Sequence, residues 1–475
     1  MSDCCAESSN EAFDVAVIGA GSAGFSAAIT AADAGARVAL IGHGTIGGTC
    51  VNVGCVPSKA LIRAVEILHG ARASARLDGI EATAAVIDWA AVTRQQQALV
   101  DDLRQAKYSD VLPAYDRVSY LEGKASFGKD GDLRVDGQVL GASKIIIATG
   151  TRPAIPPIEG IQSVPYLTST TALELQALPA SLLVIGAGYI GAELAQTYAR
   201  AGVKVTLVSR RGLLPEAEPE IGAVLTEYFE SEGITFVKAI QYESIQQTDQ
   251  GIELALTGTD GSQALQAEKV LIATGRAPNT DSLNLPNANI DVQSNGGVVV
   301  DAQMRTTRTD VYAAGDVTGT DQFVYMAAYG AKLAAKNAMN GNSLSYDNSA
   351  MPAVVFTDPQ VASVGMTEAA AKEAGHAVKV SVLTLDNVPR ALAARDTRGL
   401  IKLVADEKSR RLLGAHILAP EGADSIQTAA MAIKAGMTYD DLGAMIFPYL
   451  TTVEGIKLAA QTFDMDVRKL SCCAG

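Results

Sequence analysis

Two glycine-rich turns, each set between short apolar strands, constrain the fold of this chain more than any other feature. The first lies in FDVAVIGAGSAGFSAAITAADAGARVALIG (residues 13–42) and the second in SLLVIGAGYIGAELAQTYARAGVKVTLVSRR (residues 181–211). Both follow the pattern G-x-G-x-x-G, whose glycines permit a tight turn, close approach of a pyrophosphate and close packing of helix on strand. We therefore predict two dinucleotide-binding units, with motif residues Gly19, Gly21 and Gly24 in the first and Gly186, Gly188 and Gly191 in the second.

The second unit ends in basic residues. Its last strand runs into Ser209, Arg210 and Arg211, at the point where an NAD site carries an acidic side chain for the ribose 2′-hydroxyl. Arginines there suit a 2′-phosphate, so we predict that this unit binds NADPH. The alternative is that both arginines are ordinary exposed loop residues.

The first unit lacks the acidic residue that the same pattern predicts. Its second strand ends in Leu40, Ile41, Gly42 and His43, which offer no carboxylate to a ribose. We expect the backbone, water or another side chain to take that role.

Two nucleotide sites imply two nucleotides in electronic contact, with NADPH as hydride donor and FAD as the acceptor that passes electrons on in pairs.

A cysteine pair follows the first unit directly, in GGTCVNVGCVPSK (residues 47–59). Cys50 and Cys55 enclose four residues, and Pro57 and Ser58 are typical of the first turn of a helix. A helix N-terminus favours the thiolate form of a cysteine, and closing this short loop gives a plausible reducible disulfide. Paired cysteines in a chain of this length indicate redox or metal chemistry more often than structural cross-links.

Together these segments resemble the flavin-dependent pyridine nucleotide–disulfide oxidoreductases over essentially the whole chain. ATGTRPAIPPI (148–158) and ATGRAPN (273–279) are similar to that family's crossover strands between its FAD and NADPH domains. YAAGDVTG (312–319) resembles its second FAD segment, and MPAVVFTDPQVASVG (351–365) resembles the start of its dimerisation domain. The resemblance implies an α/β fold with two Rossmann-like dinucleotide-binding domains, for FAD and NADPH, and a C-terminal α+β dimerisation domain.

The same segments imply a division of the chain. It comprises a flexible Cys-containing leader (1–12), the first part of the FAD-binding domain with the redox disulfide (13–150), the NADPH-binding domain (151–275), the central part of the FAD-binding domain (276–345), the dimerisation domain (346–468) and a mobile C-terminal Cys tail (469–475).

The resemblance also implies roles for single residues. Cys55 is the thiol nearest the flavin, Cys50 is the outer thiol that meets substrate, and Asp316 binds the ribityl chain. Lys59 lies by flavin N5 and pairs with Glu193, which makes chemical sense because a cation there stabilises the reduced, anionic flavin. Further cofactor contacts are implied for Gly48, Thr49, Ala125, Thr149, Gly150 and Gly275.

The C-terminal segment separates this chain from relatives that act on organic disulfides. Those relatives carry a His-Pro-x-x-x-Glu-type motif, in which the histidine shuttles the proton of the substrate dithiol. Here FPYLTTVEG (447–455) places Tyr449 at the histidine position when Glu454 is aligned with the glutamate, and none of the chain's four histidines lies in this segment. A phenol with a pKa of about 10 is a poor base at neutral pH, so the usual catalyst of dithiol exchange is missing.

Thiols stand near the end of the chain instead, in the tail KLSCCAG (469–475). This tail, YLTTVEG, LTLDNVPRALA (383–393) and LRQAKYSDVL (103–112) together resemble the mercuric reductases within the family. In that group the tail cysteines of one subunit reach the redox disulfide of the other, and the resemblance implies that Tyr108 and Tyr449 flank the inner metal site.

Hg(II) is a soft ion that prefers thiolate ligands, and thiolates exchange such an ion by direct attack without a base. We therefore predict NADPH-dependent reduction of Hg(II) to Hg(0) through FAD, in mercury detoxification, by a homodimer whose active sites are shared between subunits. The expected ligands of the Hg(II) substrate are Cys50, Cys55, Cys472 and Cys473.

The N-terminal residues and the overall charge limit other functions. Only about a dozen residues precede the first glycine unit, so we expect no N-terminal metal-binding domain. Cys4 and Cys5 either form a smaller, second site that loads the metal or have no role. The net charge of −14 argues against nucleic-acid binding. The apolar stretch from Phe13 is interrupted by Asp14 and several glycines, so we expect no membrane insertion and a cytoplasmic protein.

Three alternatives remain open from the sequence. The first is a disulfide reductase of the dihydrolipoamide dehydrogenase or glutathione reductase type, against which the missing histidine counts. The second is a thiol-rich mercury or zinc buffer without catalysis, against which the two glycine units count. The third is a flavin transhydrogenase with vestigial cysteines.

Overall fold

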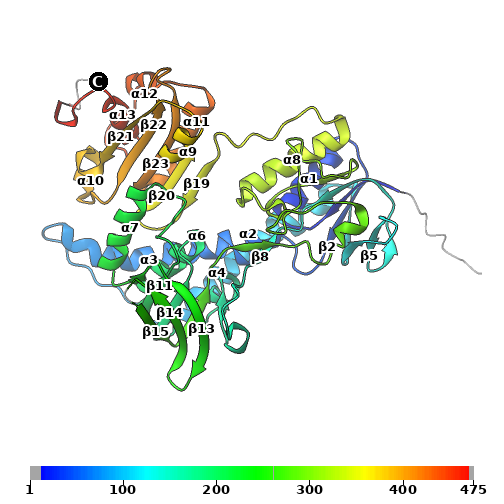
Figure 1. Ribbon diagram of the computed structural model, residues 1–475, viewed down its shortest axis with the longest axis horizontal. Helices are drawn as coiled ribbons and strands as arrows, with labels where there is room; N and C mark the ends of the chain where they lie inside the picture. The colour runs from blue at the N-terminus through cyan, green and yellow to red at the C-terminus, as the bar shows by residue number, and fades with distance from the viewer. Residues whose placement is uncertain (1–11, 260, 470–475) are drawn as a thin grey trace, which may run out of the picture. The chain divides into compact units, whose positions relative to one another are not determined.

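The computed structural model describes residues 12–259 and 261–469, so both terminal cysteine pairs lie outside the described residues (Figure 1). The chain divides into two compact units, and the division falls inside helices α3 (Cys55–Arg72) and α4 (Trp89–Arg104). Unit 1 comprises Met1–Pro57, Gln95–Pro153 and Arg276–Asp347, and unit 2 comprises Ser58–Arg94, Ala154–Gly275 and Asn348–Gly475.

Unit 1 is built on a five-stranded parallel sheet, as the first glycine unit predicts. The strand order β18-β7-β1-β2-β3 places β1, the strand before the glycine turn, at the centre. The strands are β1 (Phe13–Ile18), β2 (Val38–Gly42), β3 (Val118–Glu122), β7 (Ala142–Ile147) and β18 (Val311–Ala313).

Both faces of this sheet are covered, which a parallel sheet requires. Val17 of β1 faces helices α1 (Ser22–Asp33) and α8 (Val324–Asn340), which pack against each other. Ile18, pointing the opposite way, enters a second core with β4 (Ala125–Phe127) of a small antiparallel sheet. Because the strands are parallel, their carboxyl ends lie at one edge of the sheet, where ligands bind in such sheets.

Unit 2 begins with a second five-stranded parallel sheet in the order β12-β11-β10-β16-β9. Helices α6 (Tyr189–Arg200) and α7 (Pro219–Ser231) pack on one face, and an antiparallel three-stranded sheet packs on the other. The strands of these two sheets are β9 (Leu167–Thr168), β10 (Ser181–Ile185), β11 (Lys204–Val208), β12 (Thr235–Val237), β13 (Gln241–Thr248), β14 (Gly251–Gly258), β15 (Gly261–Ala267) and β16 (Lys269–Ile272).

The C-terminal part of unit 2 is an antiparallel sheet with helices on one face (Figure 1). Its strands, in spatial order, are β19 (Pro352–Val355), β20 (Gln360–Gly365), β23 (Leu412–Ala419), β22 (Leu400–Asp406) and β21 (Val378–Thr384), covered by α11 (Gly422–Lys434), α12 (Tyr439–Ala444) and α13 (Glu454–Gln461). Two parallel-sheet nucleotide folds and an α+β C-terminal part confirm the predicted fold class.

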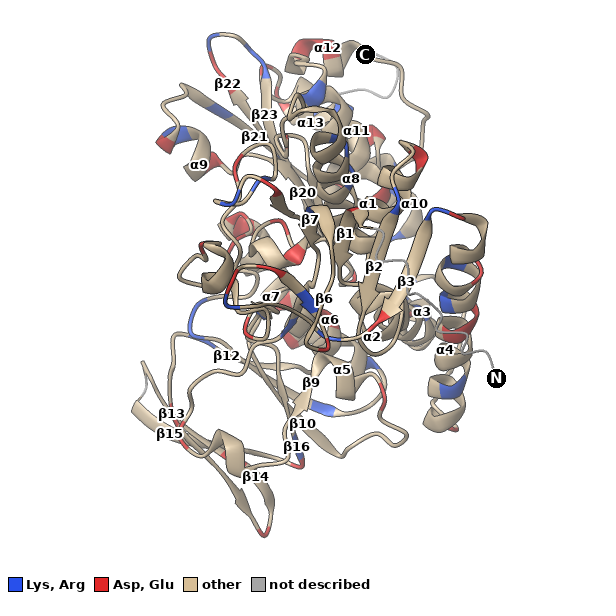
Figure 2. Ribbon diagram, turned by 90° about the vertical axis from the view of Figure 1, so that its right-hand side faces the viewer, with Lys and Arg blue, Asp and Glu red and all other residues tan. Residues whose placement is uncertain are grey.

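Charged residues are interspersed along the ribbon, as the absence of charge runs in the sequence predicts. Figure 2 shows acidic and basic residues alternating on elements such as α4. Within residues 12–259 and 261–469, no helix is long and apolar enough to cross a membrane.

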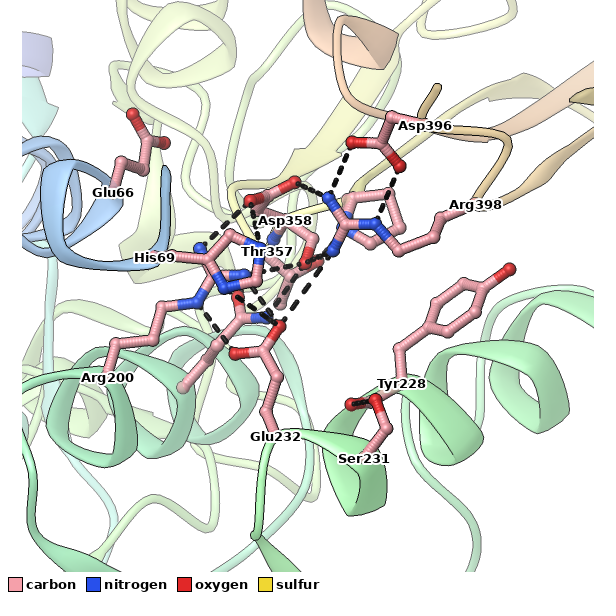
Figure 3. Close-up of polar contacts among 12 residues, drawn as sticks. Glu66, His69, Arg200, Tyr228, Ser231, Glu232, Thr357, Asp358, Asp396 and Arg398 are labelled. Atoms are coloured by element: carbon pink, nitrogen blue, oxygen red, sulfur yellow. Dashed lines mark hydrogen bonds and ion pairs between the residues drawn. The ribbon is translucent and has the colours of Figure 1, made fainter. Parts of the chain in front are cut away.

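A buried ion network ties three segments of unit 2 together (Figure 3). Arg200, at the end of α6, is 3% exposed and makes two 2.7 Å contacts with Glu232, which caps α7. The same guanidinium contacts Asp358, in the loop before β20, at 3.0 Å. Removing one member of such a network leaves a buried charge unpaired, which costs several kcal/mol, so the network restrains all three segments.

His69 of α3 completes this network. Its Nδ1 lies 3.8 Å from Glu232, and its Nε2 lies 3.8 Å from Asp358. Arg398 reaches Asp358 at 3.1 Å and pairs with Asp396 at 2.8 Å. Burial, and next the charge of Arg200, lowers the pKa of His69 below its ordinary value of 6.5. The folded state therefore favours neutral His69.

This preference predicts acid sensitivity. Below pH 6.5 the unfolded chain binds a proton that folded His69 resists, so the free energy of unfolding falls as pH falls, by at most about 1.4 kcal/mol per pH unit for one such group. We expect His69→Gln to show a shallower fall of the urea midpoint between pH 7.5 and 5.5 than the wild type. His43→Gln, at an exposed position, is the control, and equal slopes for all three proteins would contradict the account.

Candidate functional site

Two positions of the first glycine turn, Gly19 and Gly24, accept only glycine. Gly19 has φ +116°, and a Cβ on Gly24 would lie 1.7 Å from the carbonyl oxygen of Gly19. The turn therefore lies directly against α1, which begins at Ser22. Backbone N–H groups and the positive end of the helix dipole face the sheet edge there, and this arrangement fits the pyrophosphate of a dinucleotide.

The second turn, in unit 2, repeats this geometry. Gly186 has φ +107°, and a Cβ on Gly191 would lie 1.9 Å from the carbonyl oxygen of Gly186. Gly188 differs, because nothing lies within 4 Å of a Cβ built on it. Space beside Gly188 is what the close approach of a phosphate requires.

Both cysteines of unit 1 lie beside the first turn. Helix α2 (Gly48–Val53) begins so close to it that a Cβ on Gly48 would lie 2.6 Å from Cα of Gly21. Cys50 lies in α2, and Cys55 is the first residue of α3, which puts Pro57 and Ser58 in its first turn as the sequence predicts. Both are partly exposed, and the positive end of the α3 dipole stabilises negative charge on Cys55.

Tyr108 also belongs to this neighbourhood of unit 1. It lies in a π-helical turn, Gln105–Ser109, a conformation often found at functional sites. Its ring meets Phe25 edge-on at 4.9 Å, and its hydroxyl lies 3.1 Å from that of Ser22. Burial raises the pKa of Tyr108, and negative charge on Cys50 and Cys55 adds a smaller increase. The neutral phenol therefore lies within the electrostatic reach of both thiols.

Asp316 is a partly buried carboxylate whose neighbours the sequence did not reveal. It accepts a 3.0 Å hydrogen bond from Thr151, whose hydroxyl in turn accepts one of 2.7 Å from Arg276. Burial raises the pKa of Asp316, while Thr151 and Arg276 oppose that rise. Arg276 also donates to Thr49 at 3.5 Å, so it links the carboxylate to the start of α2.

Lys59 and Glu193, both in unit 2, form the ion pair that the family resemblance implies. Their Nζ and Oε2 atoms are 2.7 Å apart, with the Glu193 side chain 7% exposed. Glu193 also accepts a hydrogen bond from the backbone of Phe356, and Lys59 lies 4.8 Å from the centre of that residue's ring. Phe356 lies far from both in sequence, and no local signal identified it.

Ser209, Arg210 and Arg211 follow β11 at the carboxyl edge of the unit 2 sheet, beside the second turn. Both arginines are exposed. Arg211 contacts Glu216 at 2.6 Å, a surface pair that contributes little stability and that an anionic ligand can displace. The two guanidinium groups therefore offer charge at the point where a 2′-phosphate is expected.

The C-terminal segment of unit 2 carries Tyr449 on an exposed turn before α13. Glu454, the first residue of α13, is 8% exposed, and its carboxylate accepts a 3.2 Å hydrogen bond from the backbone of Leu450. The carboxylate of Glu454 therefore stabilises the local backbone.

The remaining predicted contacts lie at strand ends and crossovers. Thr149 donates to the carbonyl of Asn279, Gly150 and Gly275 have φ +66° and +106°, and Ala125 is a buried residue of β4. Within the described ranges no cluster of three or more His, Cys, Asp or Glu side chains has the geometry to hold a metal ion. Cys472 and Cys473 lie outside those ranges.

Comparisons with known proteins agree with this geometry. Residues 13–336 match the model of the pyridine nucleotide-disulphide oxidoreductases, and residues 351–460 match that family's dimerisation domain. The chain is 47% identical to a mercuric reductase of Streptomyces lividans, covering 98% of each, and 49% identical to one of Shigella flexneri, covering 98% of this chain and 84% of the relative. A Cu(II) complex of a HOCl-induced flavoprotein disulfide reductase from Escherichia coli superposes with a TM-score of 0.84 and 31% identity, covering 95% of this chain and 99% of that one.

The second turn yields a paired prediction. Gly191→Ala forces a methyl group against a carbonyl oxygen, so we expect it to destabilise unit 2 by about 1–3 kcal/mol. Gly188→Ala has room to fold, so we expect wild-type stability but weaker nucleotide binding, because the methyl group occupies the approach of the phosphate. Urea unfolding and nucleotide titration separate the two effects. Loss of stability in Gly188→Ala, or none in Gly191→Ala, would contradict the geometry.

Proposed function

The chain belongs to the pyridine nucleotide-disulphide oxidoreductase family, and from that premise we propose that it is an NADPH-dependent enzyme that reduces Hg(II) to Hg(0). The observation that carries the proposal is the likeness to mercuric reductases over 98% of the chain. Paired thiols beside the first glycine turn and the lack of a proton-shuttling histidine support it.

All four histidines are accounted for without a role as base. His69 lies in the ion network, and His416 is buried with its Nε2 3.0 Å from the carbonyl oxygen of Met366. His376 pairs with Asp406, and His43 is exposed after β2. Tyr449 stands where dithiol-handling relatives need a histidine, so proton transfer to an organic dithiol lacks its usual catalyst.

FAD and NADPH fit the two glycine turns. The first turn and the partly buried carboxylate of Asp316 suit FAD, and the second turn with Arg210 and Arg211 suits NADPH. When bound, FAD takes a hydride from NADPH and passes two electrons to the metal substrate. We propose residues 13–150 and 276–345 as the FAD-binding parts and residues 151–275 as the NADPH-binding domain.

The chain's own residues bind the Hg(II) substrate and place charge beside the flavin. Cys50 and Cys55 provide two thiolates, the preferred ligands of a soft ion such as Hg(II). The start of α3 stabilises negative charge on Cys55, and Tyr108 offers a neutral phenol nearby. Lys59, held by Glu193, provides the cation that favours an anionic reduced flavin.

Capture of Hg(II) is the proposed role of the C-terminal tail. The thiolates of Cys472 and Cys473 form two S–Hg bonds as two bonds to small-thiol ligands break, and Cys50 and Cys55 of the other subunit then displace them. NADPH supplies the electron pair, so Hg(II) and NADPH give Hg(0), NADP⁺ and a proton. The matched dimerisation domain supports a homodimer. The cytoplasm, where small thiols keep cysteines reduced, is the proposed compartment.

A disulfide reductase acting on organic substrates is the second candidate, favoured by the structural likeness to a flavoprotein disulfide reductase. The two candidates differ in what they require near the thiols. An organic disulfide needs a proton donor for each leaving thiolate, whereas Hg(II) needs only ligand exchange.

The role of the C-terminal tail is tested by measuring the rate of NADPH oxidation with Hg(II) in the presence of excess small thiol. We expect Cys472→Ala with Cys473→Ala to slow turnover at least about tenfold, because the tail presents thiolates at high local concentration against free competitors. Activity with weakly ligated Hg(II) should be retained.

The matched control removes the other terminal pair, by Cys4→Ala with Cys5→Ala. Unchanged turnover of this control when competing thiol is scarce would end the hypothesis that the N-terminal pair is a second loading site. Equal activity of the tail variant and the wild type under excess thiol would remove the tail from the mechanism.

A further inference from the structure

The end of β2 lacks a ribose ligand, although the rest of the first glycine turn fits a dinucleotide. Gly42 stands where the pattern has an acidic side chain. Another group of unit 1 must replace that side chain, on the premise of the proposed binding of FAD there.

The space beside Gly42 is already filled. A Cβ on Gly42 would lie 2.4 Å from the hydroxyl oxygen of Tyr120, 2.7 Å from its Cε2 atom and 2.9 Å from Cβ of Ala20. The backbone of Gly42 is outside the left-handed region, so its conformation does not demand glycine. The phenol of Tyr120 therefore occupies the position where a side chain of residue 42 would begin.

Strand register explains how Tyr120 comes to lie there. In the parallel pairing of β2 with β3, Leu40 lies beside Tyr120 and Gly42 lies beside Glu122. Paired residues project to the same face, so the Tyr120 ring leans over the end of β2 toward Ala20 of the glycine turn. Burial, and then the charge of Glu122, raises the pKa of Tyr120, so its hydroxyl is a neutral hydrogen-bond donor at physiological pH.

We propose that the Tyr120 hydroxyl replaces the missing carboxylate and binds the adenosine ribose of FAD. It lies at the carboxyl edge of the sheet, next to the turn that faces the pyrophosphate, which is where the ribose of a dinucleotide lies in such folds. Glu122, exposed at the end of β3, is the nearest carboxylate by register and is the competing candidate.

The experiment compares FAD with FMN, because FMN lacks the adenosine ribose. Holoenzyme is diluted in series and the recovery of free-flavin fluorescence gives the dissociation constant, first for FAD and then for protein reloaded with FMN. The variants are Tyr120→Phe and Glu122→Gln, with Tyr346→Phe as control. Tyr346 is another phenol of unit 1, just outside the proposed FAD-binding parts, and its hydroxyl donates to Asp321 at 3.0 Å.

Tyr120→Phe keeps the ring and removes one hydrogen bond, so we expect an FAD dissociation constant about three- to tenfold higher. FMN binding and the urea midpoint should not change, and Tyr346→Phe should leave FAD binding as in the wild type. Unchanged FAD binding in Tyr120→Phe overturns the proposal, as does an equal loss for FAD and FMN. A loss confined to Glu122→Gln assigns the ribose to that carboxylate. A wild-type protein without flavin contradicts the proposed function instead.

A double-mutant cycle tests the shared space. Gly42→Asp alone should weaken FAD binding, because its Cβ meets the Tyr120 ring. Adding Tyr120→Ala removes that ring, so that the new side chain at residue 42 fits after only a small shift of Ala20. The double variant should therefore bind FAD more tightly than either single variant. Simple additivity of the two losses would show that residues 42 and 120 do not compete for one position.

Discussion

A contact between backbone atoms that leaves no room for a methyl group shapes both nucleotide folds. At Gly24 and Gly191 a Cβ would lie 1.7 and 1.9 Å from the carbonyl oxygens of Gly19 and Gly186. This contact brings the N-terminus of the following helix to the carboxyl edge of each parallel sheet, where N–H groups and the helix dipole meet phosphate. In unit 1 the start of α2 also packs against this turn, so that the turn sets the position of Cys50.

Ion pairs and hydrogen bonds of charged side chains hold the residues around the paired cysteines and the glycine turns. In unit 1, Arg276 connects Asp316, through Thr151, with Thr49 at the start of α2. In unit 2, Glu193 holds Lys59, and the ion network of Arg200 fixes the end of α6. Such groups are costly to bury and keep their places only while every partner is present.

Local sequence patterns predicted the helices, strands and turns. They did not predict which side chains from distant segments meet, because that depends on long-range packing. The glycine spacing identified both strand–turn–helix units, and Pro57 and Ser58 marked the start of α3, because these signals act over a few residues. Tyr120 at the end of β2 was not predicted, because its place depends on the register of two strands about 80 residues apart in the sequence. Arg276 lies in ATGRAPN, which the sequence identifies only as a crossover segment. Its partners Thr151 and Thr49 lie far away in the sequence, so only the folded chain brings them together.

The most direct test measures how many atoms of Hg(0) are released for each NADPH oxidised. Purified protein with NADPH, Hg(II) and excess small thiol should release one atom of volatile Hg(0) for each NADPH oxidised, because one hydride carries the two electrons that the reduction requires. The same protein should oxidise NADPH slowly with an organic disulfide. NADPH oxidation without volatile mercury, together with rapid turnover of the organic disulfide, would contradict the account and assign the chain to the disulfide reductases.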